Sequence, residues 1–125
     1  MKKFIFICSV FIFSNHIFAE EVMEKIDDNN YIVRTATLCS AKGYKSPTPL
    51  EVYINKKGVV TKVVALPNRE TPKYFKLVKE QYMPQFTGKK LKDISKVDAI
   101  AGATMSSNAV KENIKAALEY YKMHK

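Results

Sequence analysis

Residues 98–107 read Asp-Ala-Ile-Ala-Gly-Ala-Thr-Met-Ser-Ser and lead directly into an amphipathic segment that runs almost to the end of the chain. Gly102 and Ala103 are small, so another backbone or a bulky ligand can come close to them. Thr104 places a hydroxyl just before the expected helix, where free N–H groups and the helix dipole favour a phosphate. Taken alone, the stretch is more typical of a plain turn and helix cap, so the phosphate interpretation depends on the rest of the chain.

The helix predicted after this stretch is the best-defined element of the sequence. Its apolar residues recur at helical spacing: Val110, Ile114, Ala117, Leu118 and Tyr121. Charged residues lie mostly on the opposite side, which predicts that one face packs on a sheet and the other faces water. We expect Ser106, Ser107 or Asn108 to cap its N-terminus.

Upstream of the helix, the pattern predicts strands. Residues 31–39 are rich in β-branched side chains, and residues 50–54 alternate between apolar and polar side chains. A turn over residues 55–58 leads to a returning strand over residues 59–66, which together predict a β-hairpin. The polar, acidic residues 20–30 predict either a short helix or an unfixed leader.

A second helix is expected to begin at Pro72, with Thr71 as its N-cap, and to close at Pro84. The apolar residues expected on its buried face are Tyr74, Phe75, Leu77, Val78 and Tyr82. Residues 85–95 read as a connector with a short strand or turn. The predicted fold is therefore α+β, a small antiparallel sheet with helices packed on one face, including the C-terminal amphipathic helix.

The first nineteen residues have the order of a secretory signal peptide. Lys2 and Lys3 precede an apolar run over residues 4–13, and the small residue Ala19 ends a cleavage site. The run is too short to span a membrane, and Cys8 is poorly placed for lipidation because the apolar run continues past it. We expect cleavage after Ala19 and a periplasmic or otherwise exported protein of one small domain.

The composition excludes several classes of protein. After cleavage only one cysteine, Cys39, and one histidine, His124, remain, so neither an intramolecular disulfide nor a Cys/His zinc site can be assembled. A Ser-His or Cys-His nucleophile pair would need the penultimate residue of the chain. The net charge of +9 favours anionic cofactors, lipids or acidic redox partners over nucleic acid, which an exported protein rarely meets, with plain solubility as the alternative.

Over residues 41–121 the chain resembles the FMN-binding domain family, which includes domains in the C subunit of the sodium-translocating NADH:quinone reductase and the G subunit of the Rnf complex. The resemblance rests on the order and spacing of short motifs: Gly43-Tyr44 with Pro47, the hairpin with Gly58, Glu70-Thr71-Pro72, Phe86-Thr87-Gly88-Lys89 and residues 98–107. The resemblance implies an FMN-binding domain over residues 41–125, and the preceding residues 20–40 are expected to hold a leader and the first strand.

In that family, a threonine at the place of Thr104 carries FMN through a phosphoester that a flavin transferase installs from FAD. Asp98, Gly102, Ala103 and Thr104 match the acceptor pattern, whereas Ala101 stands where a hydroxyl residue is usual. The resemblance implies that Ser106 and Ser107 contact the phosphate, and that Asp98 serves transferase recognition, with a turn-forming role as the alternative.

The resemblance also implies that Glu70 and Thr71 line the isoalloxazine, although Thr71 serves equally well as a helix cap. Tyr44 either stacks on the ring or packs within its loop. The expected function is an exported electron carrier with FMN on Thr104, no catalytic constellation of its own, and redox proteins or a membrane electron-transport complex as partners. The alternative is a module of the same fold that binds FMN non-covalently or serves without flavin as an accessory subunit.

Overall fold

The computed structural model describes residues 21–125, and the predicted signal peptide with its cleavage site lies outside them. Four antiparallel strands form one sheet in the order β1-β2-β3-β4: Met23–Asp27, Asn30–Arg34, Leu50–Asn55 and Val60–Ala65. The α+β fold class and the hairpin of β3 and β4 are confirmed. Within the described part of the chain, no helix is long and apolar enough to cross a membrane.

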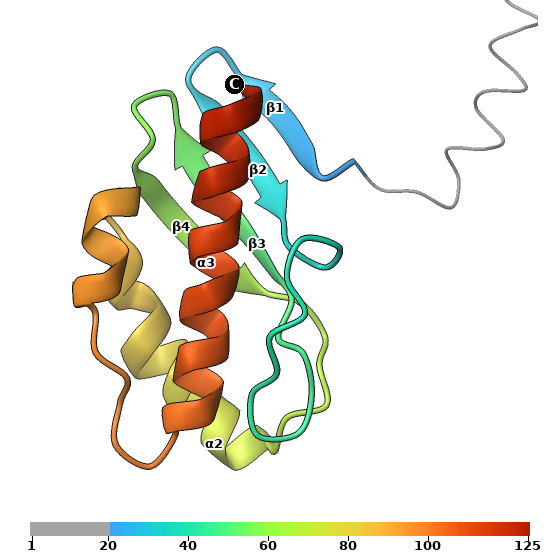
Figure 1. The fold of residues 1–125 in the computed structure, drawn as a ribbon, viewed down its shortest axis with the longest axis vertical. Helices are drawn as coiled ribbons and strands as arrows, with labels where there is room; N and C mark the ends of the chain where they lie inside the picture. The colour runs from blue at the N-terminus through green and yellow to red at the C-terminus, as the bar shows by residue number, and fades with distance from the viewer. Residues whose placement is uncertain (1–20) are drawn as a thin grey trace, which may run out of the picture.

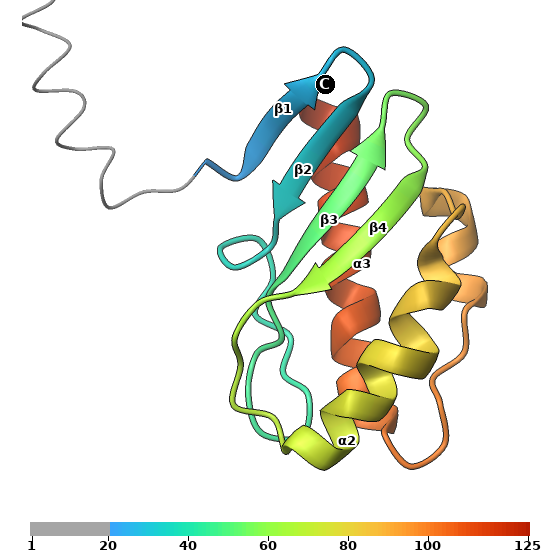
Figure 2. The same cartoon turned by 180° about the vertical axis from the view of Figure 1, so that it is seen from behind.

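The helices lie on one face of the sheet. The long helix α3, Thr104–His124, runs along that face, and the opposite face carries no element among residues 21–125 (Figures 1 and 2). Leu50, Val52 and Ile54 of β3 alternate as fully buried residues and meet the buried side of α3. This side of α3 is the apolar stripe that the helical spacing predicts. The buried residues of β3, which recur with period 2, and those of α3, which recur with period 3.6, therefore pack together in one core.

The segment before β2 is a strand, so its prediction as a helix or an unfixed leader is wrong. β1 pairs with β2 through Met23↔Val33, Glu24↔Ile32 and Lys25↔Tyr31, although most of its side chains are exposed. Backbone pairing, with little side-chain burial, holds this charged edge strand in place.

The predicted strand over residues 31–39 ends early, at Arg34. The buried side chain of Thr35 donates to Asn113 of α3 at 2.6 Å and accepts from the amide of Leu50 at 2.9 Å. The Thr35 amide still donates to the Leu50 carbonyl at 3.0 Å, and the two side-chain bonds add a connection from α3 to the ends of β2 and β3.

The second helix starts at Pro72 as predicted but changes type along its length. The α-helix α2 spans Pro72–Leu77, the π-helical turn η1 spans Val78–Tyr82, and the 3-10 turn η2 spans Met83–Phe86. Pro84 has no N–H group to continue an α-helix, so the chain tightens there. A further 3-10 segment, η3, covers Leu91–Lys96, where the sequence predicted a strand or turn.

Candidate functional site

The first residue of α3 is Thr104, and its side chain is exposed. Gly102 turns the chain with a φ of 87°, a left-handed conformation that glycine adopts without steric cost. Ala103 occupies the N-cap position, and no side chain caps the helix. The capping interpretation of Thr104, Ser106, Ser107 and Asn108 is therefore wrong. Within residues 21–125 the Thr104 hydroxyl has no hydrogen-bond partner.

The N-terminus of α3 offers unused backbone donors beside this hydroxyl. The N–H of Ser107 bonds to the carbonyl of Ala103 at 2.9 Å and begins the helical ladder. The N–H groups of Thr104, Met105 and Ser106 precede it and have no intrahelical acceptor. Together with the helix dipole they make a favourable place for a phosphate group beside Thr104.

A cavity of about 310 Å³ opens at this end of α3. Three of its walls are large hydrophobic side chains that stand in solvent: Tyr44 is 64% exposed, Tyr74 43% and Met105 56%. Exposed aromatic side chains around one hollow suit a flat ring that would cover them. The residues that line the cavity are Tyr44, Tyr74, Gly102, Ala103, Thr104, Met105 and Ser106.

Glu70 holds the loop that carries Tyr44 against the first turn of α3. Its buried carboxylate accepts hydrogen bonds from three consecutive loop amides, those of Tyr44 at 2.7 Å, Lys45 at 2.6 Å and Ser46 at 2.8 Å. It also accepts one from the Ser106 hydroxyl. One carboxylate thus connects two walls of the cavity, the 43–46 loop and the start of α3.

Burial raises the pKa of the Glu70 carboxyl, but the hydrogen bonds from Ser106 and the three loop amides outweigh it. The net pKa lies below its usual value, so the carboxylate is ionised at neutral pH. These donors occupy both oxygen atoms of the carboxylate. Glu70 therefore holds in place the loop and the helix turn that line the cavity. The predicted contact of Glu70 with the isoalloxazine stays a prediction.

The other predicted site residues lie outside this cavity. Ser107 is buried, and its hydroxyl oxygen accepts from the amide of Ile100 at 3.4 Å. Thr71 takes the predicted N-cap position of α2, although its side chain makes no capping hydrogen bond. Asp98 is exposed. Burial of the Tyr82 side chain and, to a smaller extent, the negative charge of Asp98 raise the pKa of Tyr82 to about 12. Tyr82 in turn donates to the carbonyl of Val97 at 3.1 Å, which fixes the start of the 98–107 stretch.

Two cavity residues were missed by sequence reasoning. Tyr74 was assigned to the buried face of the second helix, and Met105 was given no role. Both are exposed at the cavity instead. Tyr74 lies three positions after Thr71, close to the helix start, where the first turn extends past the end of the sheet. The spacing of apolar residues does not predict the exposure of Tyr74, because it assumes that the sheet covers every turn of the helix equally.

The comparison with known families agrees with this geometry. The family model described as the FMN-binding domain matches residues 43–119, which include the 43–46 loop, Glu70, Thr104 and most of α3. This match covers more than half of the sequence and so establishes that the chain is a member of the family. The chain belongs to the FMN-binding domain family, and its cofactor is FMN. No curated protein matches this sequence.

Replacing Glu70 with glutamine tests its structural role. Glutamine keeps one carbonyl oxygen and turns an NH₂ group toward the donors, so we expect a loss of about 2 kcal/mol in unfolding free energy at pH 7. Because the folded pKa lies below the unfolded value of about 4.5, the contribution of Glu70 is present above that value and is lost as the pH falls through the folded pKa.

The measurement is urea unfolding of both proteins between pH 3 and pH 7. The difference between the original protein and Glu70→Gln should shrink on the acid side. Glu112→Gln, an exposed site on α3, is the matched control and should change stability by less than about 0.5 kcal/mol. A difference that stays constant across this range would contradict the assigned role.

Proposed function

We propose that this chain is an exported flavoprotein that carries FMN through a phosphoester on Thr104 and passes electrons between redox partners. The observation that carries the proposal is the free hydroxyl of Thr104, which stands at a helix N-terminus on the edge of a cavity walled by Tyr44 and Tyr74. This places an acceptor oxygen, phosphate-binding amides and aromatic walls within one site.

Attachment is a transfer reaction in which the chain is the acceptor. The Thr104 oxygen attacks the phosphorus on the riboflavin side of FAD, the P–O–P bond breaks, and AMP leaves while the threonine proton goes to a base. A threonine hydroxyl is a weak nucleophile, so the reaction needs a flavin transferase and its metal ion. Glu70 is the buried carboxylate nearest the site, and its oxygens are taken by the loop amides and Ser106.

The residues around the cavity suit the holding of this cofactor. The N–H groups of Thr104, Met105 and Ser106, which have no intrahelical acceptor, would suit the phosphate, and Tyr44 and Tyr74 line the cavity that would hold the ring. FMN supplies the redox chemistry when bound, and the protein orients it. The cavity is open on one side, which leaves an edge for a redox partner to approach.

Coexpression with a flavin transferase, followed by export, tests the proposal. The protein should run as a fluorescent band on a denaturing gel, with an intact mass above that of the bare chain by one FMN less one water. Expression without the transferase should give the bare mass. A flavin that binds in native buffer but is fully released on denaturation would favour the non-covalent alternative, and no flavin under any condition would favour the accessory module.

Export is the part of the proposal that rests on the first nineteen residues. We expect the mature protein to begin at Glu20, because Ala19 ends a basic, apolar and small-residue sequence. N-terminal sequencing of the protein recovered from outside the cytoplasm checks this. A protein that begins at Met1, or one with an acylated Cys8, would contradict it.

A further inference from the structure

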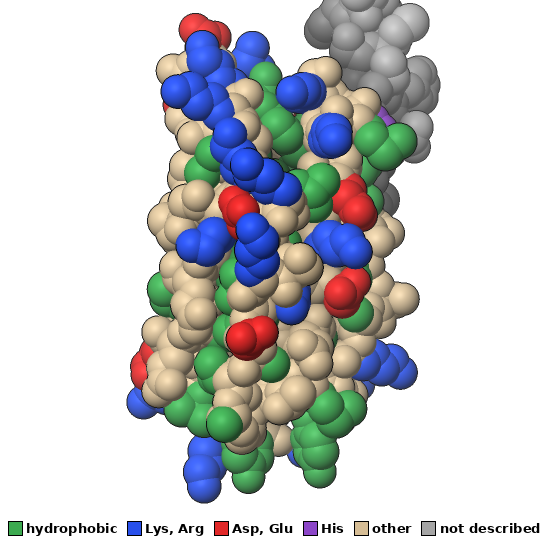
Figure 3. Space-filling model, turned by 60° about the vertical axis from the view of Figure 1, so that its left-hand side comes forward, with side chains coloured by type: hydrophobic (Ala, Val, Ile, Leu, Met, Phe, Trp, Pro, Cys, Tyr) green, Lys and Arg blue, Asp and Glu red, His purple; other side chains and the backbone are tan. Residues whose placement is uncertain are grey.

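A basic hollow lies at the end of the molecule where α3 finishes. The hollow has a volume of about 220 Å³, and its lining contains no carboxylate side chain. Five of the lining residues are lysines: Lys57, Lys90, Lys92, Lys122 and Lys125. We call these five residues the lysine cluster. In the space-filling view, Lys and Arg side chains crowd the upper part of the molecule, where this cluster lies (Figure 3).

The lysine cluster is assembled from three separate segments. Lys57 lies in the turn between β3 and β4, Lys90 and Lys92 lie around the start of η3, and the other two lie at the end of α3. The negative end of the α3 dipole favours cations at this end of the molecule, whichever segment they belong to. The fold therefore concentrates like charge at this end of the molecule.

The side chains of the described residues leave the lysine cluster without an ion pair. The neighbouring carboxylate of Asp93 accepts from the backbone amide of Lys90 at 3.3 Å and pairs with Lys96 at 3.9 Å. Unpaired positive charge of this kind attracts a negatively charged partner.

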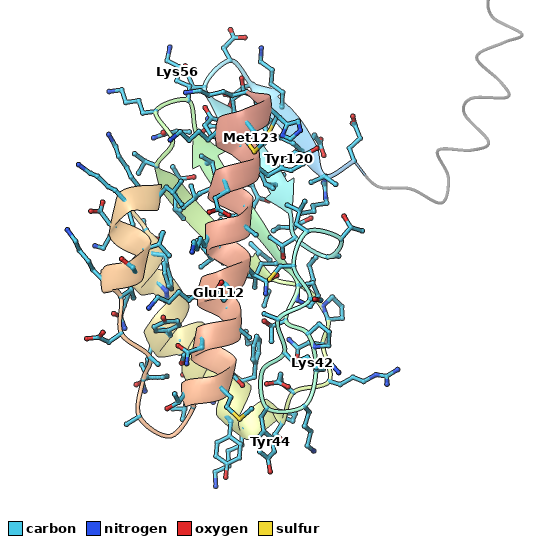
Figure 4. All side chains as sticks on the ribbon, viewed as in Figure 1. Lys42, Tyr44, Lys56, Glu112, Tyr120 and Met123 are labelled. Carbon is cyan, nitrogen blue, oxygen red and sulfur yellow. The ribbon has the colours of Figure 1, made fainter. Side chains whose placement is uncertain are left out.

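The position of the cluster argues against a redox protein as that partner. α3 has 21 residues, and at 1.5 Å per residue its two ends are about 30 Å apart. Tyr44 marks the end with Thr104, whereas Lys56 and Met123 mark the opposite end (Figure 4). A protein docked on the lysine cluster would not reach a cofactor held in the Thr104 cavity. A partner that binds the molecule without exchanging electrons with it does not need to come close to the cofactor.

The chemistry around the cluster matches a lipid surface. Leu91 is a half-buried apolar residue of the same hollow, and the side chain of Met123 at this end is 80% exposed. Lysine heads over apolar side chains are typical of proteins that lie on anionic bilayers. We propose that the lysine cluster docks on a membrane surface rich in anionic phospholipid and thereby turns the Thr104 cavity away from the bilayer. This proposal stands whether or not FMN is covalently attached.

The test uses the exported protein, with its N-terminus determined by mass spectrometry, and vesicles of phosphatidylcholine with or without phosphatidylglycerol. The cluster variant carries Lys57→Gln, Lys90→Gln, Lys122→Gln and Lys125→Gln. The control variant removes the same charge at the Thr104 end of the molecule through Lys42→Gln, Lys45→Gln, Lys73→Gln and Lys76→Gln. All eight side chains are exposed, so both variants should fold and melt like the original protein.

We expect the original protein to partition onto the anionic vesicles and not onto the neutral ones. Each lysine near an anionic surface strengthens partitioning about fivefold, so the cluster variant should lose at least about 100-fold and the control variant less than about tenfold. Equal partitioning onto both vesicle types, or equal losses in both variants, would overturn the proposal. Binding to polyglutamate without binding to the anionic vesicles would also overturn it, because the partner would then be an acidic protein.

Discussion

Thr104→Val should abolish covalent attachment of FMN to this protein. Valine keeps the β-branched shape of threonine and removes the only hydroxyl that is exposed on the first turn of α3 beside the cavity. Since the Thr104 side chain caps nothing and has no partner among residues 21–125, the free energy of unfolding should change by less than about 0.5 kcal/mol. The labelled fraction should fall from most of the protein to none.

Two serines within one turn of Thr104 provide the matched controls. Ser107 is fully buried against Ile100, and Ser106 donates to Glu70, so neither hydroxyl is free for a transferase. Ser106→Ala and Ser107→Ala should therefore keep the covalent flavin, with Ser106→Ala less stable by about 1 kcal/mol because Glu70 loses a donor. Thr104→Ser should remain labelled, since the hydroxyl is retained.

Peptide mass spectrometry across residues 97–111 decides the assignment. The modified residue should be Thr104 in the original protein, and Ala101→Ser, which restores the usual hydroxyl of the family pattern, should raise the labelled fraction if labelling is incomplete. FMN found on Ser106 or Ser107 would defeat the assignment. So would a Thr104→Val protein that still carries covalent flavin.

Gly43→Ala should destabilise the protein more than other glycine substitutions. A Cβ at this position would lie 2.2 Å from Oε1 and 2.9 Å from Cδ of Glu70, and 3.0 Å from the Ser106 hydroxyl. The carboxylate must then move and give up several of its hydrogen bonds. We expect a loss of about 2–4 kcal/mol in unfolding free energy, and a fall in melting temperature of about 10–20 °C.

Gly88→Ala is the control for this substitution. Gly88 has a φ of 87°, but no atom lies within 4 Å of its added Cβ, so the cost is only that of the left-handed backbone, about 1 kcal/mol. The double variant Gly43→Ala with Glu70→Ala should be more stable than the sum of the two single losses predicts, because the colliding side chain is gone. Additive losses, measured by urea unfolding, would contradict this explanation.

The sequence by itself determined the elements whose signals are local. The stripe at helical spacing after residue 103 predicted α3, and alternation about a glycine turn predicted the β3–β4 hairpin. The 98–107 stretch marked Thr104 as a hydroxyl just ahead of a helix, and in the structure it is the first residue of that helix. Periodicity and turn chemistry depend on neighbouring residues only, so a single sequence carries them.

The tertiary structure decided what depends on distant partners. β1 is a strand because β2 pairs with its backbone, although its own residues are polar. Tyr74 lies on the cavity because the first turn of α2 extends past the sheet. Glu70 binds the 43–46 loop and Ser106 across separations of 24 to 36 residues. A buried carboxylate is stable only where donors converge on it, and that convergence exists only once the loop, Glu70 and α3 have packed together.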